Sequence, residues 1–168
     1  MKTYISLALS LFFTITLVAQ DKTCNCCTEK YSEFDFWLGT WEVTNPNGTR
    51  AGVNVIKKVQ NNCILQENWI SATPGYTGTS NNFYNYKANQ WEQIWVDNQG
   101  QSLHLKGNKV GNQMILRTED ETNAEGKTFF HRVTWTDNDD GSVRQLWETV
   151  TEGKEVAIAF DGLYKRKD

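Results

Sequence analysis

The sequence predicts an all-β protein that folds as a closed antiparallel up-and-down barrel of about ten strands. Short runs in which apolar and polar residues alternate recur about every ten to fourteen positions, and residues typical of tight turns separate them. No window keeps helical spacing over three turns. A meander joined by hairpins leaves two exposed edges unless it closes, which favours a barrel. A two-sheet sandwich is the alternative, but it needs longer crossover links, and the only loops of useful length are near residues 72–78 and 120–127.

The expected strands follow one another along the chain, with a turn signal between most neighbours. They cover residues 36–44, 51–60, 63–71, 79–87, 90–97, 101–107, 112–119, 128–136, 142–150 and 155–165. Residues that supply the positive backbone angles of tight hairpins stand at Asn47-Gly48, Pro74-Gly75, Asn98 to Gly100, Gly107-Asn108, Asp140-Gly141 and Glu152-Gly153. Because such short links join antiparallel neighbours, we expect each strand to pair with the next one in the chain.

Residues 1–19 have the pattern of a secretory signal peptide. Lys2 precedes an apolar stretch from Ile5 to Val18, which is shorter than the ~18 residues of a membrane span, and the small residue Ala19 follows it. We expect cleavage after Ala19 or nearby, and export to the periplasm or out of the cell. An uncleaved membrane anchor is the alternative. After cleavage we expect no membrane span.

Cleavage would leave a Cys-rich N-terminal arm over residues 20–33 and a barrel domain over residues 34–166. The chain has 17 Lys and Arg against 20 Asp and Glu residues, and loss of Lys2 changes the net charge from −3 to −4. This mildly acidic balance lacks the basic footprint that nucleic-acid binding requires. We therefore expect no nucleic-acid partner.

The four cysteines, Cys24, Cys26, Cys27 and Cys63, lie after the signal peptide, and an even number in an exported protein predicts disulfides. A bond between the adjacent Cys26 and Cys27 would close a strained ring. We therefore expect Cys63 to be bonded to Cys26 or Cys27, with the other two closing a small loop or left unpaired. A metal site on the three clustered thiolates is the alternative, but no His lies near them and an oxidising compartment opposes free thiolates. We expect no metal.

The segment Phe34-Asp35-Phe36-Trp37-Leu38-Gly39-Thr40-Trp41 resembles the opening of the calycins, the group that includes the lipocalins and the fatty-acid-binding proteins. In that group the Trp of a Gly-x-Trp motif closes one end of a small barrel, and in lipocalins a late basic residue packs across it. The resemblance therefore implies that Gly39, Trp41 and Arg166 close this barrel.

More specifically, the chain resembles secreted bacterial lipocalin-like domains of unknown function that open with Phe-Asp-Phe-Trp and Gly-x-Trp. Their later motifs are similar to Trp91-x-Gln93-x-Trp95-Val96-Asp97, Thr134-Trp135, Val143-Arg144-Gln145-x-Trp147-Glu148 and Phe160-Asp161-Gly162-x-Tyr164. The resemblance spans residues 34–166. It implies a barrel and carries no known activity.

The chain departs from the better-known relatives where they have helices or haem. Only residues 45–50 separate the first two strands, which is too short for the two-helix lid of fatty-acid-binding proteins, and no helical periodicity follows Gly153. Ten strands without lid helices resemble the nitrobindin-like haem barrels, whose iron-binding His lies on a late strand. Here Ala157, Ile158 and Ala159 occupy that region. We therefore expect no haem and no other cofactor.

Two strands carry the same Gln-x-Trp pattern, Gln93-x-Trp95 and Gln145-x-Trp147. Because side chains alternate between the two faces of a strand, each pattern places an amide and an indole on one face. If these faces point inward, the lumen has aromatic walls and a few amides, as a pocket for a small apolar or aromatic ligand requires. Trp69 joins this set, although alternation alone does not fix its face. The alternative is that these Trp side chains simply fill a narrow barrel.

The remaining polar residues are expected to be structural. His104 and His131 have no second metal ligand at short spacing. Arg132 and Arg144 lie opposite the Trp faces, so exposed ion pairs worth ~0.5 kcal/mol are expected, with partners among Glu67, Asp97 and Glu148. If these arginines instead point inward, they would bind an anionic group.

The sequence therefore predicts an exported binding protein whose lumen holds a small apolar or aromatic molecule. Two alternatives remain: an interaction module that meets a protein partner through a solidly packed barrel, and an enzyme that uses the barrel mouth. We expect no catalytic residue, because no nucleophile, phosphate-loop or paired-histidine motif is present. A continuous cavity above ~300 Å³ would favour the binding protein.

Overall fold

A computed structural model describes residues 24–167, so the predicted signal peptide over residues 1–19 and its cleavage position lie outside the described residues. Within this range the two helical segments are short: α1 covers Glu29–Ser32 and the 3₁₀ turn η1 covers Asp35–Trp37. Neither is long enough to cross a bilayer.

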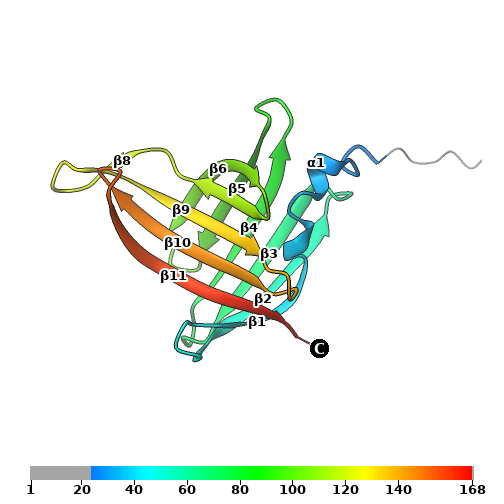
Figure 1. The fold of residues 1–168 in the computed structure, drawn as a ribbon, viewed down its shortest axis with the longest axis horizontal. Helices are drawn as coiled ribbons and strands as arrows, with labels where there is room; N and C mark the ends of the chain where they lie inside the picture. The colour runs from blue at the N-terminus through cyan, green and yellow to red at the C-terminus, as the bar shows by residue number, and fades with distance from the viewer. Residues whose placement is uncertain (1–23, 168) are drawn as a thin grey trace, which may run out of the picture.

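The described chain forms a closed antiparallel barrel of ten strands (Figure 1). These strands are β1 (Gly39–Thr44), β2 (Arg50–Val59), β3 (Ile64–Ser71), β4 (Thr77–Asn85), β5 (Gln90–Asp97), β6 (Ser102–Val110), β7 (Gln113–Arg117), β9 (Thr128–Asp137), β10 (Val143–Thr151) and β11 (Glu155–Arg166). A further short strand, β8 (Glu121–Thr122), pairs with the start of β9. Pairing of β11 with β1 closes the cylinder. The all-β class, the closed barrel and the lack of lid helices are therefore confirmed.

The N-terminal edge of the barrel differs from the expected strand over residues 36–44. Asp35–Trp37 turns as η1, and β1 begins at Gly39, where φ is +138°. A Cβ at Gly39 would lie 2.6 Å from Nη1 of Arg166, so a side chain has no room there. Because Phe36 and Trp37 are apolar, they resemble the start of a strand in the sequence. In the structure they belong to the segment that covers one end of the barrel.

That covered end, called here the closed end, holds a solid aromatic cluster. Phe34, Trp37, Trp41, Trp91 and Trp135 are all at most 1% exposed, and we call these five residues the aromatic plug. Phe34 stacks on Trp37 with ring centroids 5.1 Å apart and meets the edge of Trp135 at 5.2 Å. The plug therefore fills the lumen where β1 begins and β11 ends.

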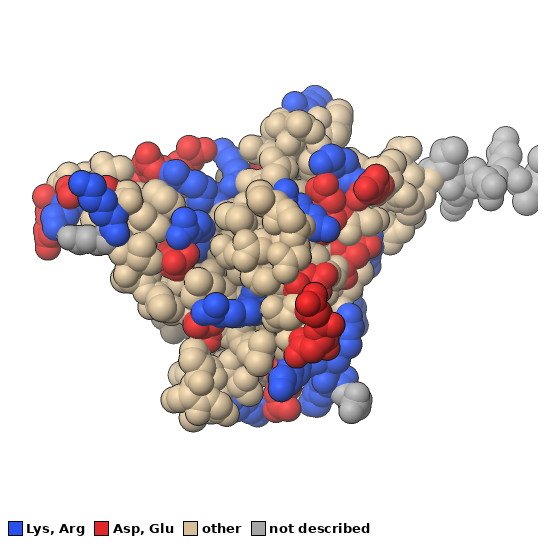
Figure 2. Space-filling view, in the orientation of Figure 1, with Lys and Arg blue, Asp and Glu red and all other residues tan. Residues whose placement is uncertain are grey.

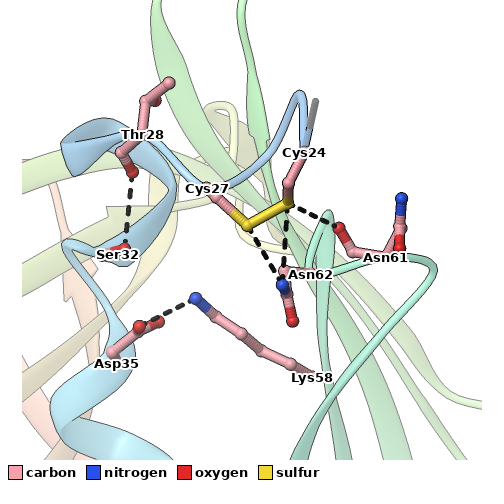
Figure 3. Close-up of polar contacts among 8 residues, drawn as sticks. All are labelled: Cys24, Cys27, Thr28, Ser32, Asp35, Lys58, Asn61 and Asn62. Atoms are coloured by element: carbon pink, nitrogen blue, oxygen red, sulfur yellow. Dashed lines mark hydrogen bonds and ion pairs between the residues drawn. A yellow bond between two sulfur atoms is a disulfide. The ribbon is translucent and has the colours of Figure 1, made fainter. Parts of the chain in front are cut away.

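One disulfide fastens the N-terminal arm to the closed end, and a second, drawn in Figure 3, closes a small loop within the arm. Cys26 is bonded to Cys63, and Cys24 is bonded to Cys27, which is one of the arrangements that the sequence left open. Beside them, Lys58 Nζ lies 2.7 Å from Asp35 Oδ2. The Cys26–Cys63 bond closes a loop over a separation of 37 residues, which stabilises a fold by ~3 to 4 kcal/mol in the chain-entropy model. Disulfide bonding of this kind is typical of an extracytoplasmic protein.

The opposite end, called here the open end, carries the loops at residues 45–49, 72–76 and 98–101. Strands β9, β10 and β11 extend past the rest of the barrel on the side away from α1 (Figure 1). In the described chain, β1 pairs with β11 over residues 163–166, whereas β10 pairs with it from residue 155. The first half of β11 therefore borders the open end without a β1 partner.

Charged side chains of both signs are interspersed on the face drawn in Figure 2. The pairs that the sequence analysis expected on the outer surface include Arg132 with Glu148, at 2.9 Å. Arg144 pairs instead with Asp161, at 2.7 Å, because these residues lie diagonally across the β10–β11 ladder. Both arginines face away from the lumen, so the inward, anion-binding alternative is wrong for them.

Candidate functional site

A cavity of about 340 Å³ lies at the open end of the barrel. All five residues predicted to bind a ligand line it, namely Trp69, Gln93, Trp95, Gln145 and Trp147. Its volume exceeds the ~300 Å³ at which ligand pockets begin. The lumen is therefore divided, with the aromatic plug at one end and open space at the other.

Strand register explains why the five side chains meet. Gln93 lies across from Asn82, and Trp95 lies across from Ser80. Trp147 lies across from Val133 and from Phe160. Residues directly opposite in an antiparallel ladder share a face of the sheet. Both β5 and β10 run toward the open end, so each Gln lies deeper in the barrel than the Trp two residues after it.

Two glycines make room for the indole rings. A Cβ at Gly78 would lie 2.2 Å from Cζ2 of Trp95, and a Cβ at Gly52 would lie 2.6 Å from the ring of Trp69. The rings therefore rest directly on the backbone of neighbouring strands. Any larger residue at Gly78 must displace the Trp95 indole, and one at Gly52 must displace both the Trp69 indole and the backbone oxygen of Ile70, which lies 2.4 Å from the Cβ position.

The indole of Trp147 is held by a histidine. Its Nε1 donates to Nδ1 of His131 at 3.2 Å, and Thr149 Oγ1 lies 3.0 Å from the same nitrogen. Burial lowers the pKa of His131, which keeps the imidazole neutral and Nδ1 able to accept. His131 is thus a satisfied structural residue, as the sequence analysis expected, and it fixes one wall of the cavity.

Beneath the aromatic walls lies a connected set of polar side chains, called here the polar floor. Its members are Asn54, Glu67, Ser80, Asn82, Gln93, Gln145 and Tyr164. Glu67 accepts from Asn54 Nδ2 at 2.7 Å and from Ser80 Oγ at 2.6 Å. Gln93 donates to Asn82 Oδ1 at 2.9 Å, and Tyr164 donates to Gln145 Oε1. Both predicted amides therefore belong to this network.

Glu67 is the chemically distinctive member of the polar floor. Its side chain is 3% exposed, and burial raises its pKa from 4.5 to about 7, against the opposing effect of the hydrogen bonds from Ser80 and Asn54. Burial also raises the pKa of Tyr164 well above its usual range. Asn54 Oδ1 is buried and has no hydrogen-bond partner among the described residues.

The cavity is lined by one acid and one base, Glu67 and Arg50. Arg50 stands at the mouth, where its half-exposed guanidinium lies 3.3 Å from Glu42. Glu67 lies at the floor, and its two hydrogen-bond donors are neutral. The two charged groups are therefore at opposite depths of the cavity.

The sequence analysis did not place Glu67 at the site, because it considered this residue as a partner for a surface arginine. The available signal was its alternation with Leu65 and Trp69, all three of which face inward. The other polar-floor residues absent from the prediction are Asn54, Ser80, Asn82 and Tyr164, the last of which sits two residues before Arg166 on β11. His104 pairs with Glu92 at 2.8 Å, away from the cavity. In the described part of the chain, no three potential metal-ligating side chains gather.

The residues that the calycin resemblance assigned to barrel closure do meet at the closed end. The guanidinium carbon of Arg166 lies 4.6 Å from the centre of the Trp41 ring. Arg166 Nη1 also donates to the Leu38 carbonyl at 3.1 Å, and Trp41 Nε1 donates to the Trp37 carbonyl at 2.9 Å. Gly39 leaves the space that this guanidinium occupies.

The closed antiparallel barrel is consistent with a calycin-like fold. A scan against protein-family models and a search of curated proteins both found no match.

Proposed function

We propose that this protein is an exported, lipocalin-like binding protein that holds a small apolar or aromatic molecule in the open end of its barrel. One observation carries the proposal: a cavity of about 340 Å³ has three indoles as walls and a hydrogen-bonded polar floor beneath them. Apolar walls with a few fixed polar groups are what recognition of a small molecule requires.

The polar floor supports this function because it is already connected before a guest arrives. Hydrogen bonds to Asn82 and from Tyr164 hold the side-chain amides of Gln93 and Gln145, so these amides are already oriented when a ligand binds. A ligand atom placed over the floor meets oriented donors and acceptors, and preorganisation of this kind lowers the entropic cost of binding. The indoles supply apolar contact area and stacking.

Titration of tryptophan fluorescence with small aromatics, fatty acids and haem tests the proposal. We expect saturable quenching by at least one small apolar or aromatic compound. The absence of saturable quenching by any of them would contradict the proposal and favour a protein-interaction module instead.

A pair of matched variants locates the site. Leu103 on β6 lines the cavity, whereas Ile94 on the neighbouring β5 points outward and is 44% exposed. Leu103→Trp is expected to fill the cavity and abolish the heat of binding in isothermal titration calorimetry. Ile94→Trp adds the same side chain on the outside and should leave binding unchanged. Equal binding by both variants would place the guest elsewhere.

A further inference from the structure

Resting on the ligand-binding function proposed above, we propose that the guest of this cavity is a cationic amine, whose apolar or aromatic body lies among Trp69, Trp95 and Trp147 and whose ammonium group lies against Glu67. The proposal thus specifies the charge and the functional group of the guest as well as its apolar character.

The first support is the unused acceptor capacity of Glu67. A carboxylate offers about four lone-pair sites, and the donors recorded for Glu67 are Asn54 Nδ2 and Ser80 Oγ. Glu67 also lines the cavity, which places it beside the space in which a guest would lie. An ammonium group carries up to three N–H donors and fits this remaining capacity.

The second support is that Glu67 lacks the cation that a buried carboxylate normally has. Of the other buried carboxylates, Glu92 pairs with His104, whereas Asp97 accepts hydrogen bonds from the Tyr76 hydroxyl and from the backbone N–H groups of Gln99 and Gln101. Asp35, Glu148 and Asp161 pair with Lys58, Arg132 and Arg144. Among the described residues, the one base that lines the cavity is Arg50, which is engaged with Glu42 at the mouth. A cationic guest would supply the missing charge.

The third support is the chemistry of the walls. Indole is the aromatic side chain that attracts cations best, and the attraction grows when the cation is removed from water. Three indoles surround the cavity above a single carboxyl group. A carboxylate guest would instead meet like charge at Glu67. A neutral guest would leave the carboxylate without a cationic partner at pH values above the pKa of Glu67.

Binding of an ammonium group must move a proton. At pH values below the pKa of Glu67, which is about 7, the carboxyl is neutral and must release its proton as the cation enters. The other titratable or charged groups at or behind the cavity wall are Tyr164, Tyr76 with its partner Asp97, Arg50 and His131. Burial raises the pKa of both tyrosines and lowers that of His131, which favours the neutral form of all three.

The test compares three probes of similar size, namely 2-phenylethylamine, 2-phenylethanol and 3-phenylpropionate, by isothermal titration calorimetry at pH 8. We expect the amine to bind at least tenfold more tightly than the alcohol, and the carboxylate to bind most weakly. Amine affinity should rise about tenfold for each pH unit up to 7 and then level off. Glu67→Gln should bring the amine and the alcohol within about twofold of each other and flatten the pH profile.

Glu92→Gln is the matched control, because it removes another buried carboxyl that faces away from the cavity. It should leave the preference for the amine intact. If Glu67→Gln does not fold, proton release by the wild-type protein decides the matter: calorimetry at pH 6 in buffers of different ionisation enthalpy should count close to one proton per amine bound.

The outcomes separate the two proposals. Equal affinity for amine and alcohol, preference for the carboxylate, or no proton release at pH 6 would overturn the amine assignment while the ligand-binding function stands. If none of the three probes, the fatty acids or haem binds, both proposals fall. A tenfold preference for the amine that survives in Glu67→Gln would also overturn the role of Glu67.

Discussion

The two ends of the barrel contain the same type of side chain in opposite settings. At the closed end, Trp37, Trp41 and Trp135 are fully buried and contact other aromatic rings. At the open end, Trp69, Trp95 and Trp147 surround a cavity of about 340 Å³. All of them point inward. The difference comes from the segment just before β1, because Phe34 and Trp37 enter the closed end and the described chain sends no equivalent segment into the open end.

This comparison separates stability from function within one lumen. Removing a side chain from a filled lumen lowers stability strongly, because the cavity left behind does not collapse. An indole that already borders empty space has fewer contacts to lose. We therefore expect side chains at the closed end to contribute most to the free energy of unfolding. Side chains at the open end contribute less to stability and are available for ligand binding.

The largest predicted effect follows from that contrast. Trp135→Ala should lower the free energy of unfolding by ~3 to 5 kcal/mol, since it opens a cavity inside the aromatic plug. Trp95→Ala should cost ~1 to 2 kcal/mol, because that ring is partly exposed beside the cavity. Urea denaturation followed by circular dichroism measures both. Equal losses would show that the two ends do not differ in packing.

The sequence showed which side chains share a face of a strand, whereas depth in the barrel was not accessible from it. The Gln-x-Trp patterns place Gln93, Trp95, Gln145 and Trp147 on inward faces through a period of two. The same rule applies to Trp91 and Trp135, which belong to the plug. Whether an inward Trp fills the lumen or lines a cavity depends on which other segments reach that height, and strand periodicity carries no information about that.

The inward position of Glu67 and the turn at Asp35–Trp37 were not predicted, and each has an identifiable physical reason. A Glu in a strand is normally at the surface, so Glu67 was considered as an ion-pair partner although its neighbours Leu65 and Trp69 face inward. The turn at Asp35–Trp37 has the apolar composition of a strand start. Its role depends on the contact of Trp37 with Trp135, which is distant in sequence.

The two disulfides near the closed end are expected to contribute unequally to stability. Replacing Cys26 and Cys63 with Ser should lower the free energy of unfolding by ~3 to 4 kcal/mol, because a loop over a separation of 37 residues is released. Replacing Cys24 and Cys27 releases a separation of 3 residues and should cost ~2 kcal/mol. Denaturation midpoints under non-reducing conditions distinguish them. A larger loss from the Cys24/Cys27 variant would contradict the tethering role of Cys63.

The polar floor gives the open end a distinct pH dependence. Burial raises the pKa of Glu67 to about 7 in the folded protein, above the usual 4.5, so between these values the folded state binds more protons than the unfolded state. Stability should therefore fall as pH rises from 4.5 to 7, by up to ~3 kcal/mol relative to Glu67→Gln. Unfolding free energies of both proteins across this range measure the effect. Parallel pH profiles would show that Glu67 titrates normally.

The smallest predicted effect concerns the fit of one indole. Gly78→Ala should push Trp95 toward the cavity, cost ~1 to 2 kcal/mol and weaken guest binding several-fold. Thr77→Ala, at the exposed neighbouring position, serves as the control and should change neither quantity by a comparable amount. Unchanged binding in Gly78→Ala would mean that Trp95 does not contact the guest.

The most direct test of the division of the lumen is nuclear magnetic resonance of the indole N–H groups of the seven Trp residues, assigned and followed while 2-phenylethylamine is added. We expect the signals of Trp69, Trp95 and Trp147 to shift saturably with one shared Kd. The signals of the four Trp residues of the plug should stay in place. Shifts centred on the plug, or no saturable shift in any indole signal, would contradict the assignment of binding to the open end.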